Sequence, residues 1–262
     1  MTHYLNDDVL NKDILNKAII ELEHLMQIAN VPSHHGIEHA LAVLNHMNKA
    51  LHENEYKIND RFFHLYEILA LQLAALLHDA DDRKYFDSSD NFNNAINIIN
   101  LILPIDFDNK DFILTFTIES ISYVSASKNG NDIPNRAIEY PELLWPRYCD
   151  RLEAIGKIGV QRTIDYNYEI NEPLFTDDTP RAKTYDDVIQ FATPDRFIKY
   201  KKSGGHSDSA IDHFYDKLLH ICDFGNCYNI YLTEASLSRK QFLIDICIEF
   251  GKINEFPFYM LN

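Results

Sequence analysis

The chain has 262 residues and a formal net charge of −16 at pH 7, and 46% of its residues are hydrophobic. This charge excludes a nucleic-acid polymer or an anionic membrane as the main partner, because both are polyanions. No apolar run reaches the roughly 20 residues that span a bilayer, and the N-terminus lacks a secretory signal. The four cysteines form no Cys-x-x-Cys pair, so we expect free thiols in a reducing, cytoplasmic setting.

Hydrophobic spacing predicts an all-α fold. Steps of three and four residues indicate helices over 13–29, from about 35 to about 53, and over 62–77, the last so apolar that it belongs in the core. The remaining chain predicts helices over 91–103, 111–123, about 142–164, 209–222 and 234–252, a loop over 125–141, and an irregular excursion with short helices over 166–206. We therefore expect one compact domain over 1–262, with a metal-site core over about 31–165, the excursion to about 207 and closing helices over about 208–253.

The predicted core helix runs into His78 and Asp79, and further charged residues follow up to Lys84. An imidazole beside a carboxylate at the end of a buried helix is costly unless something compensates for it. A divalent cation would do so, because imidazole and carboxylate together suit Mn, Fe, Co, Ni or Zn. Taken alone, the pair indicates only a helix end with a solvated acidic tail.

Two other stretches supply ligand types for the same ion. In the second helix His39 and His46 share one face with Val43, since spacings of three, four and seven return to the same side. Asp150 lies in a later predicted helix; taken alone, it indicates a surface ion pair with Arg147. Two imidazoles and two carboxylates would hold a divalent ion and leave open positions for water and a substrate oxygen.

Four motifs together resemble the HD superfamily of metal-dependent phosphohydrolases, and most closely its compact branch that includes bacterial nucleotide pyrophosphohydrolases. The resemblance spans about residues 30–250, and the Asp-Arg-Leu-Glu-Ala-Ile-Gly run is its most specific part. The motifs are His34-His35-Gly36-Ile37-Glu38-His39, the stretches 75–86 and 146–159, and Asp212-His213-Phe214-Tyr215-Asp216-Lys217-Leu218-Leu219. Gly156 and Gly159 in the third motif also predict close approach of a neighbouring element.

The resemblance implies a compact helical phosphohydrolase with one divalent ion, Mn first and Fe, Co, Ni, Zn or Mg as alternatives. It implies a small phosphorylated substrate, and we expect hydrolysis of a nucleoside triphosphate to the monophosphate and pyrophosphate. No nucleic-acid polymer or membrane partner is expected, and a homo-oligomer is compatible with it. The implied ligands are His39, His78, Asp79 and Asp150. Asp82 and Lys84 are the candidate catalytic residues: Asp82 would assist proton transfer, and Lys84, with Arg147 and Arg151, would steady the phosphate charge.

Two departures from the family pattern keep the alternatives open. Ala42 stands where members often carry Arg, and His35 stands where many carry Asp. A 5′-nucleotidase acting on monophosphates and a non-catalytic metal or nucleotide binder are the alternatives. A di-iron oxygenase would need a second metal, for which only His34 and His35 are candidates.

Several further residues admit both a functional and a structural interpretation. His46 either borders the pocket or is an ordinary buried histidine. Packing accounts for His213 and Phe214, and the stretch 128–131 is either a lid over substrate or a simple turn.

Overall fold

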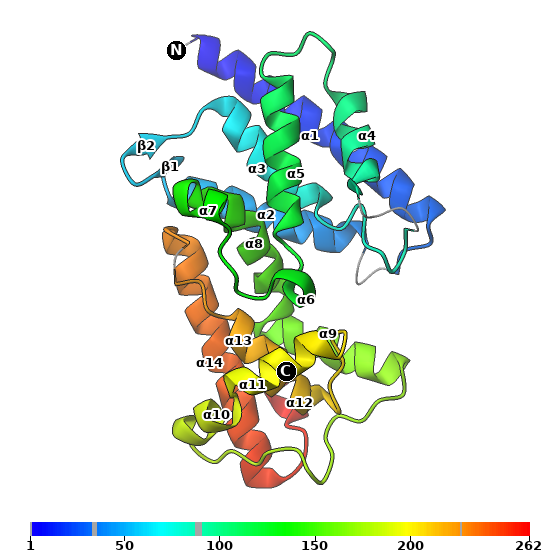
Figure 1. Cartoon of the computed structure of the whole chain (residues 1–262), viewed down its shortest axis with the longest axis vertical. Coiled ribbons are helices and arrows are strands. Elements are labelled where there is room, and N and C mark those ends of the chain that lie inside the picture. Colours follow the sequence, from blue (N-terminus) through cyan, green and yellow to red (C-terminus); the bar gives the residue numbers. More distant parts are fainter. Residues whose placement is uncertain (1, 33–35, 87–90, 226) are drawn as a thin grey trace. The chain divides into compact units, whose positions relative to one another are not determined.

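The computed structural model describes residues 2–32, 36–86, 91–225 and 227–262 (Figure 1). For residues 2–10 and 127 it describes the backbone alone. The regular elements of the described chain are helices, apart from one antiparallel pair of two-residue strands, β1 (Lys57–Ile58) and β2 (Arg61–Phe62). This confirms the predicted all-α fold. No described helix combines the length and the apolar character that crossing a bilayer requires.

The chain forms two compact units, and each draws on several separate stretches of sequence. Unit 1 comprises Met1–Val124, Pro134–Asp150 and Asn226–Tyr231; unit 2 comprises Ser125–Ile133, Arg151–Gly225 and Leu232–Asn262. Because the stretches alternate along the chain, the units are not two successive domains. The expected single domain over 1–262 stays a prediction.

Unit 1 is built around the core helix that the sequence predicts. This helix, α3 (Leu65–Leu77), packs against α1, α2 and α5, and nine of its residues are buried. Helices α1, α3, α4 and α5 lie side by side (Figure 1). The bounds of the other helices are α1 (Thr2–Ile28), α2 (Ile37–Glu53), α4 (Asn93–Ile102), α5 (Lys110–Ser122), α7 (Asn135–Glu139), the 3-10 helix η3 (Pro141–Leu144) and α8 (Trp145–Ala154), whose first part belongs to this unit.

The predicted start of the core helix at Phe62 is wrong. Phe62 lies in β2 and is 66% exposed. The helix starts three residues later because the carboxylate of Glu67 accepts the backbone N–H of His64 at 2.7 Å, which caps its first turn. The first helix is also longer than predicted, since no glycine or proline interrupts the first 30 residues.

The prediction of one continuous helix over 142–164 is also wrong, because the helix is interrupted at Ile155, which has an extended backbone. Gly156 has φ of +71°, a conformation that side chains with a Cβ rarely adopt, and α9 (Gly156–Glu169) starts there. The predicted close approach is present, since a Cβ on Gly156 would lie 2.6 Å from Cγ of Arg239, and one on Gly159 would lie 2.1 Å from the carbonyl oxygen of Ala154.

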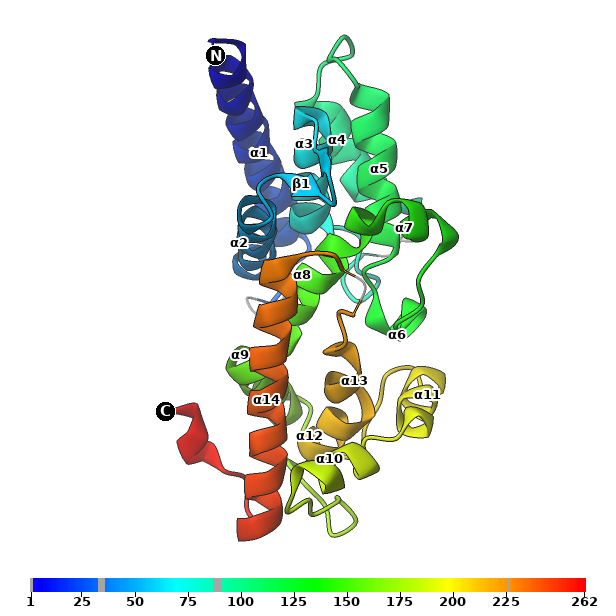
Figure 2. The same ribbon diagram turned by 90° about the vertical axis from the view of Figure 1, so that its left-hand side faces the viewer.

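Unit 2 contains the predicted excursion and the closing helices. The loop predicted over 125–141 instead contains α6 (Ala126–Asn129), in this unit, and α7, in unit 1. The predicted helix over 209–222 contains a π-helical segment, an uncommon local widening of the helix. Figure 2 labels the helices α10 to α14. The bounds are α10 (Tyr185–Phe191), α11 (Pro194–Lys202), α12 (Ala210–His213), the π-helix η4 (Phe214–Leu218), α13 (Leu219–Ile221), α14 (Ile230–Ile253) and the 3-10 helix η5 (Phe258–Leu261).

All four cysteines are buried free thiols, as predicted: Cys149, Cys222, Cys227 and Cys247. Buried thiols of this kind contribute to packing.

Candidate metal centre

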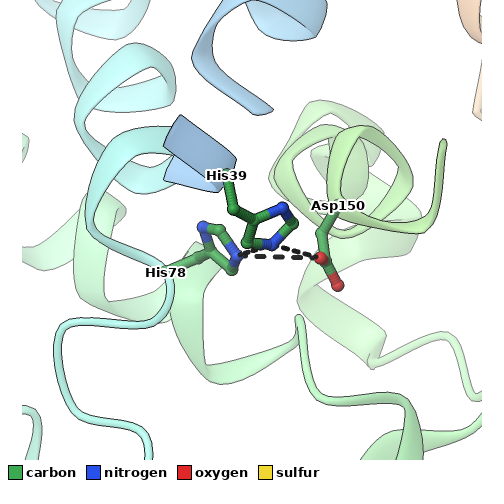
Figure 3. A group of neighbouring side chains, drawn as sticks. All are labelled: His39, His78 and Asp150. Carbon is green, nitrogen blue, oxygen red and sulfur yellow. Dashed lines mark hydrogen bonds and ion pairs between the residues drawn. The ribbon is translucent and has the colours of Figure 1, made fainter. Parts of the chain in front are cut away.

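Three ligand-type side chains from different helices of unit 1 converge on one point (Figure 3). Nε2 of His39 lies 3.3 Å from Oδ1 of Asp150, and Nε2 of His78 lies 3.7 Å from the same oxygen. The two imidazole nitrogens are 3.3 Å apart. All three candidate ligand atoms lie within 4.8 Å of one another, so this His-His-Asp group can hold a metal ion.

Asp79 adds a second carboxylate to the group. Its Oδ2 lies 3.3 Å from Nε2 of His78 and 3.7 Å from Nε2 of His39. About a quarter of the Asp79 side chain is exposed, whereas both histidines are buried. The structure therefore brings together the four side chains that the sequence analysis proposed as metal ligands.

The end of α3 places His78 and selects which of its nitrogens faces the cluster. The apolar residues of α3 bury the helix, and His78 follows its last residue as the C-cap, with helical φ and ψ of −58° and −31°. Nδ1 of His78 lies 2.9 Å from the carbonyl oxygen of Ala75, to which it donates a hydrogen bond. A proton on Nδ1 leaves the Nε2 lone pair available, which is the arrangement of metal-binding histidines. The three-residue spacing is the only sequence signal for this bond.

His39 reaches the cluster from the buried face of α2. The predicted face of this helix is buried at His39, Val43 and His46 and half-buried at Ala42. His46 itself is 2.5 Å from the hydroxyl of Tyr231, through Nδ1. This contact supports the interpretation of His46 as an ordinary buried histidine.

Burial and charge act in opposite directions at the cluster. Burial acts to lower the pKa of His78, but the carboxylates of Asp79 and Asp150 outweigh it and raise that pKa to about 9. Burial acts to raise the pKa of Asp150, and contacts with His39 and His78 outweigh it and lower that pKa. Without a cation, the His78 imidazole therefore retains its second proton beside the two carboxylates. Two imidazoles and two carboxylates match the donor set that divalent transition metals take, so the residues fit such an ion.

The turn after α3 carries the two predicted catalytic residues. Asp82 is half-buried, its Oδ1 accepts the backbone N–H of Lys84 at 3.0 Å, and its carbonyl oxygen accepts that of Tyr85 at 2.9 Å. Burial chiefly raises the pKa of Asp82, and the nearby Asp79 carboxylate raises it further. The Lys84 side chain is exposed. These contacts fix the backbone of the turn, and the catalytic roles of both residues stay predictions.

Arg147 and Arg151 are each only 1% exposed. Nε of Arg147 donates to the carbonyl oxygen of Tyr123 at 2.6 Å. Arg151 belongs to unit 2, where it donates to the side chain of Asn131 at 2.9 Å and to the carbonyl oxygen of Gly130. Both guanidinium groups thus brace turns of the chain, and their predicted contacts with substrate stay predictions.

The secondary candidates divide between described and undescribed residues. His34 and His35 lie outside the described residues, so a second metal beside them stays a prediction. His213 is half-buried and lies edge-on against Tyr200, with ring centroids 5.4 Å apart, and desolvation lowers its pKa; Phe214 is buried. This confirms the packing interpretation of that motif.

The fold and the site define an all-α protein with a His-His-Asp group able to hold a metal ion. No family model matches the chain. It is 41% identical over 225 residues to "Uncharacterized protein L803" of Acanthamoeba polyphaga mimivirus, covering 82% of this chain and 88% of that protein. The chain belongs to the same family as that viral protein.

A crystal structure of a protein from Lactobacillus plantarum has a similar fold. The TM-score is 0.59, and the similarity covers 94% of this chain and 96% of the other at 20% sequence identity. At that identity the comparison shows a shared fold.

Proposed function

We propose that the protein is a divalent-metal-dependent phosphohydrolase of the HD superfamily that converts a nucleoside triphosphate into the monophosphate and pyrophosphate. The observation that carries the proposal is the convergence of His39, His78, Asp79 and Asp150, whose facing nitrogen and oxygen atoms are 3.3–3.7 Å apart. Their order along the chain is the order of the motifs that resemble this superfamily. A divalent ion held there, with Mn as the first choice, would activate water and polarise a phosphoryl oxygen.

The residues of the turn after α3 supply the remaining chemistry. Asp82 is a half-buried carboxylate whose pKa burial raises. A carboxylate of this kind is suited to take a proton from the attacking water. The exposed ammonium of Lys84, two residues further on, can move to meet a phosphate, where its charge would offset the charge that develops in the transition state.

The bond that is cleaved depends on how the distal phosphates are held. Cleavage between the α and β phosphorus atoms follows from the resemblance to the pyrophosphohydrolase branch. That branch often has Arg three residues after the first ligand histidine, whereas this chain has the half-buried Ala42 there and so lacks that cation. This substitution favours a second candidate, a 5′-nucleotidase that acts on monophosphates.

The test is a panel of nucleoside triphosphates and monophosphates, each with Mn, Co, Ni or Mg, in which phosphate and pyrophosphate are measured separately. We expect pyrophosphate and monophosphate from a triphosphate. Orthophosphate and nucleoside from a monophosphate would instead support the 5′-nucleotidase. The Asp79→Ala variant is the control for contaminating activity, and it should be inactive in every reaction.

The panel also separates the remaining alternatives. Tight nucleotide binding without turnover in the presence of any of the four metals would show that the protein is a non-catalytic nucleotide binder. An absence of both binding and turnover would overturn the assignment to nucleotides. A di-iron oxygenase would instead contain two iron atoms per chain, which elemental analysis of protein grown with iron would reveal.

A further inference from the structure

Helix α11 in unit 2 concentrates positive charge in a chain that is strongly acidic overall. Its nine residues include four basic side chains and only one carboxylate, that of Asp195, whereas the whole chain has 40 acidic and 24 basic residues. In such a chain carboxylates are plentiful as partners. The basic residues are Arg196, Lys199, Lys201 and Lys202.

These cations are used in different ways. Arg196 is paired twice, with Asp212 at 2.7 Å and with Asp216 at 2.6 Å, and so fixes α11 to the following helix. Lys201 on α11 and Lys240 on α14 are half-buried. Neither ammonium lies within ion-pair distance of a carboxylate in the part of the chain that the structure describes.

Lys201 and Arg151 meet at the same glycine. The Nζ of Lys201 lies so close to Gly130 that a Cβ there would be 2.7 Å from it, and Gly130 has φ of +53°. The guanidinium of Arg151 donates to the carbonyl oxygen of Gly130 and to the side chain of Asn131. Two positive groups from separate helices thus flank one turn whose backbone needs glycine.

A histidine joins the same group. The side chain of Asn131 donates to the carbonyl oxygen of His220 at 3.0 Å, and the imidazole of His220 stacks on Phe197 at 5.0 Å between centroids. The ammonium of Lys201 lies 5.9 Å from the centroid of the same Phe197 ring. Nε2 of His220 is buried and has no hydrogen-bond partner among the described residues. A buried polar atom of this kind calls for a ligand or another polar partner.

Lys240 is brought to this group by α14, because the hydroxyl of Ser236, one helical turn before Lys240 on the same face, donates to the carbonyl oxygen of Cys222. Burial lowers the pKa of His220, a hydrogen bond with the backbone of Tyr215 and the Asp216 carboxylate oppose this effect, and the charges of Arg196 and Lys240 add to it. Burial raises the pKa of Cys222 to about 12, against the opposing charges of Lys240 and Arg151. His220 and Cys222 are therefore near cations from α8, α11 and α14 and also near the carboxylates of Asp216 and Asp223.

We propose that Lys201 and Arg151 at the Gly130–Asn131 turn, together with Lys240 on α14, form a binding site in unit 2 for a small, multiply charged phosphate anion. Ammonium groups act as point charges for phosphate oxygens, and a braced guanidinium supplies a fixed positive charge. The proposed site uses three cations, whereas a nucleic-acid surface follows a long backbone with many contacts. This site goes beyond the proposed hydrolase, because it needs neither a metal nor turnover.

Titration calorimetry of the 262-residue chain with inorganic triphosphate, in a buffer containing a chelator, tests the site without the metal centre. We expect saturable binding that weakens at least about tenfold in Lys201→Gln and in Lys240→Gln, because each loses a charge-assisted contact. Lys202→Gln is the matched control, since Lys202 is the next residue of α11 and is exposed. It should bind as the unchanged protein does.

Thermal unfolding of each variant verifies that the fold is intact, and the two lysines lie on different helices, so one misfolded variant leaves the other informative. Asp79→Ala should retain the binding, because the site does not use the metal cluster. Unchanged affinity in both Lys201→Gln and Lys240→Gln would overturn the proposal. Loss of binding in Asp79→Ala would also do so, as would equal affinity for a single-stranded oligonucleotide, which would show a general polyanion surface.

Discussion

At the scale of single residues, the four candidate ligands differ in how much they also contribute to packing. His39 and His78 are buried, and the Nδ1 bond from His78 to the carbonyl oxygen of Ala75 holds its ring in place. Asp79 and Asp150 each keep about a quarter of their side chain exposed. A carboxylate can therefore be removed with less damage to the core than an imidazole.

Asp79→Ala should weaken divalent metal binding by more than about 100-fold, which exceeds the usual cost of losing an outer-shell partner of a ligand. Phosphohydrolase activity should disappear with the metal. Elemental analysis and titration with Mn²⁺ measure the first effect. Asp108→Ala, at an exposed position away from the cluster, is the control and should retain full metal content. Full metal content in Asp79→Ala would remove Asp79 from the ligand set.

Lys84→Ala should lower kcat/KM for the nucleotide by roughly 10-fold or more, the cost of one charge-assisted contact, while metal content stays unchanged. The side chain is exposed, so folding should tolerate the change. The adjacent Arg83→Ala, also at an exposed position, serves as the comparison for a general loss of positive charge. Equal losses in the two variants would mean that Lys84 acts only through the local field.

At the scale of elements, the break between α8 and α9 ends the helix that carries Asp150. Ile155 is extended, with φ of −123°, and Gly156 follows with φ of +71°. A continuous helix would have carried the chain onward in one direction, whereas here α9 begins anew. Arg239 can approach Gly156 this closely because glycine has no Cβ.

Gly156→Ala should destabilise the protein by about 2–4 kcal/mol, from positive φ and from overpacking against Arg239. Gly204→Ala is a matched control, because Gly204 has φ of +77° but nothing within 4 Å of the new Cβ. It should cost about 1 kcal/mol, the conformational part alone. Urea unfolding of both variants gives the difference. Equal losses would show that Arg239 moves aside without cost.

At the scale of the molecule, the metal cluster connects α2, the end of α3 and α8, which are distant in sequence. Ligands from separate elements are brought together only in the folded chain, so the ion should bind the native state far better than the unfolded state. Linkage then makes the metal a stabiliser of the fold.

Adding Mn²⁺ at about 100 times its dissociation constant to chelator-treated protein should stabilise it by about 2.7 kcal/mol. This corresponds to a rise in Tm of roughly 5–10 °C for a chain of this size. Differential scanning fluorimetry measures the rise, and Asp79→Ala should lack it. A Tm that does not respond to any of the four metals would contradict a resident ion at this cluster.

The sequence by itself determined the all-α class, the core helix and the four residues of the cluster. Helical periodicity is a local property, and the apolar run that ends at Leu77 left α3 no environment other than the core. The order of ligand-type residues along the chain was also readable, because His78 and Asp79 follow that helix directly. The break at Gly156 was missed, since a glycine within a helical pattern does not reveal its own φ.

Only the tertiary structure decided which atoms meet. The distances of 3.3–3.7 Å within the cluster depend on how α2, α3 and α8 pack, which no local pattern records. The same holds for the buried guanidinium groups of Arg147 and Arg151, which the sequence offered as substrate contacts and which brace backbone turns. From the sequence both arginines look available for binding a substrate. Their hydrogen-bond partners Tyr123 and Asn131 lie 20 or more positions away and are identified only in the folded chain.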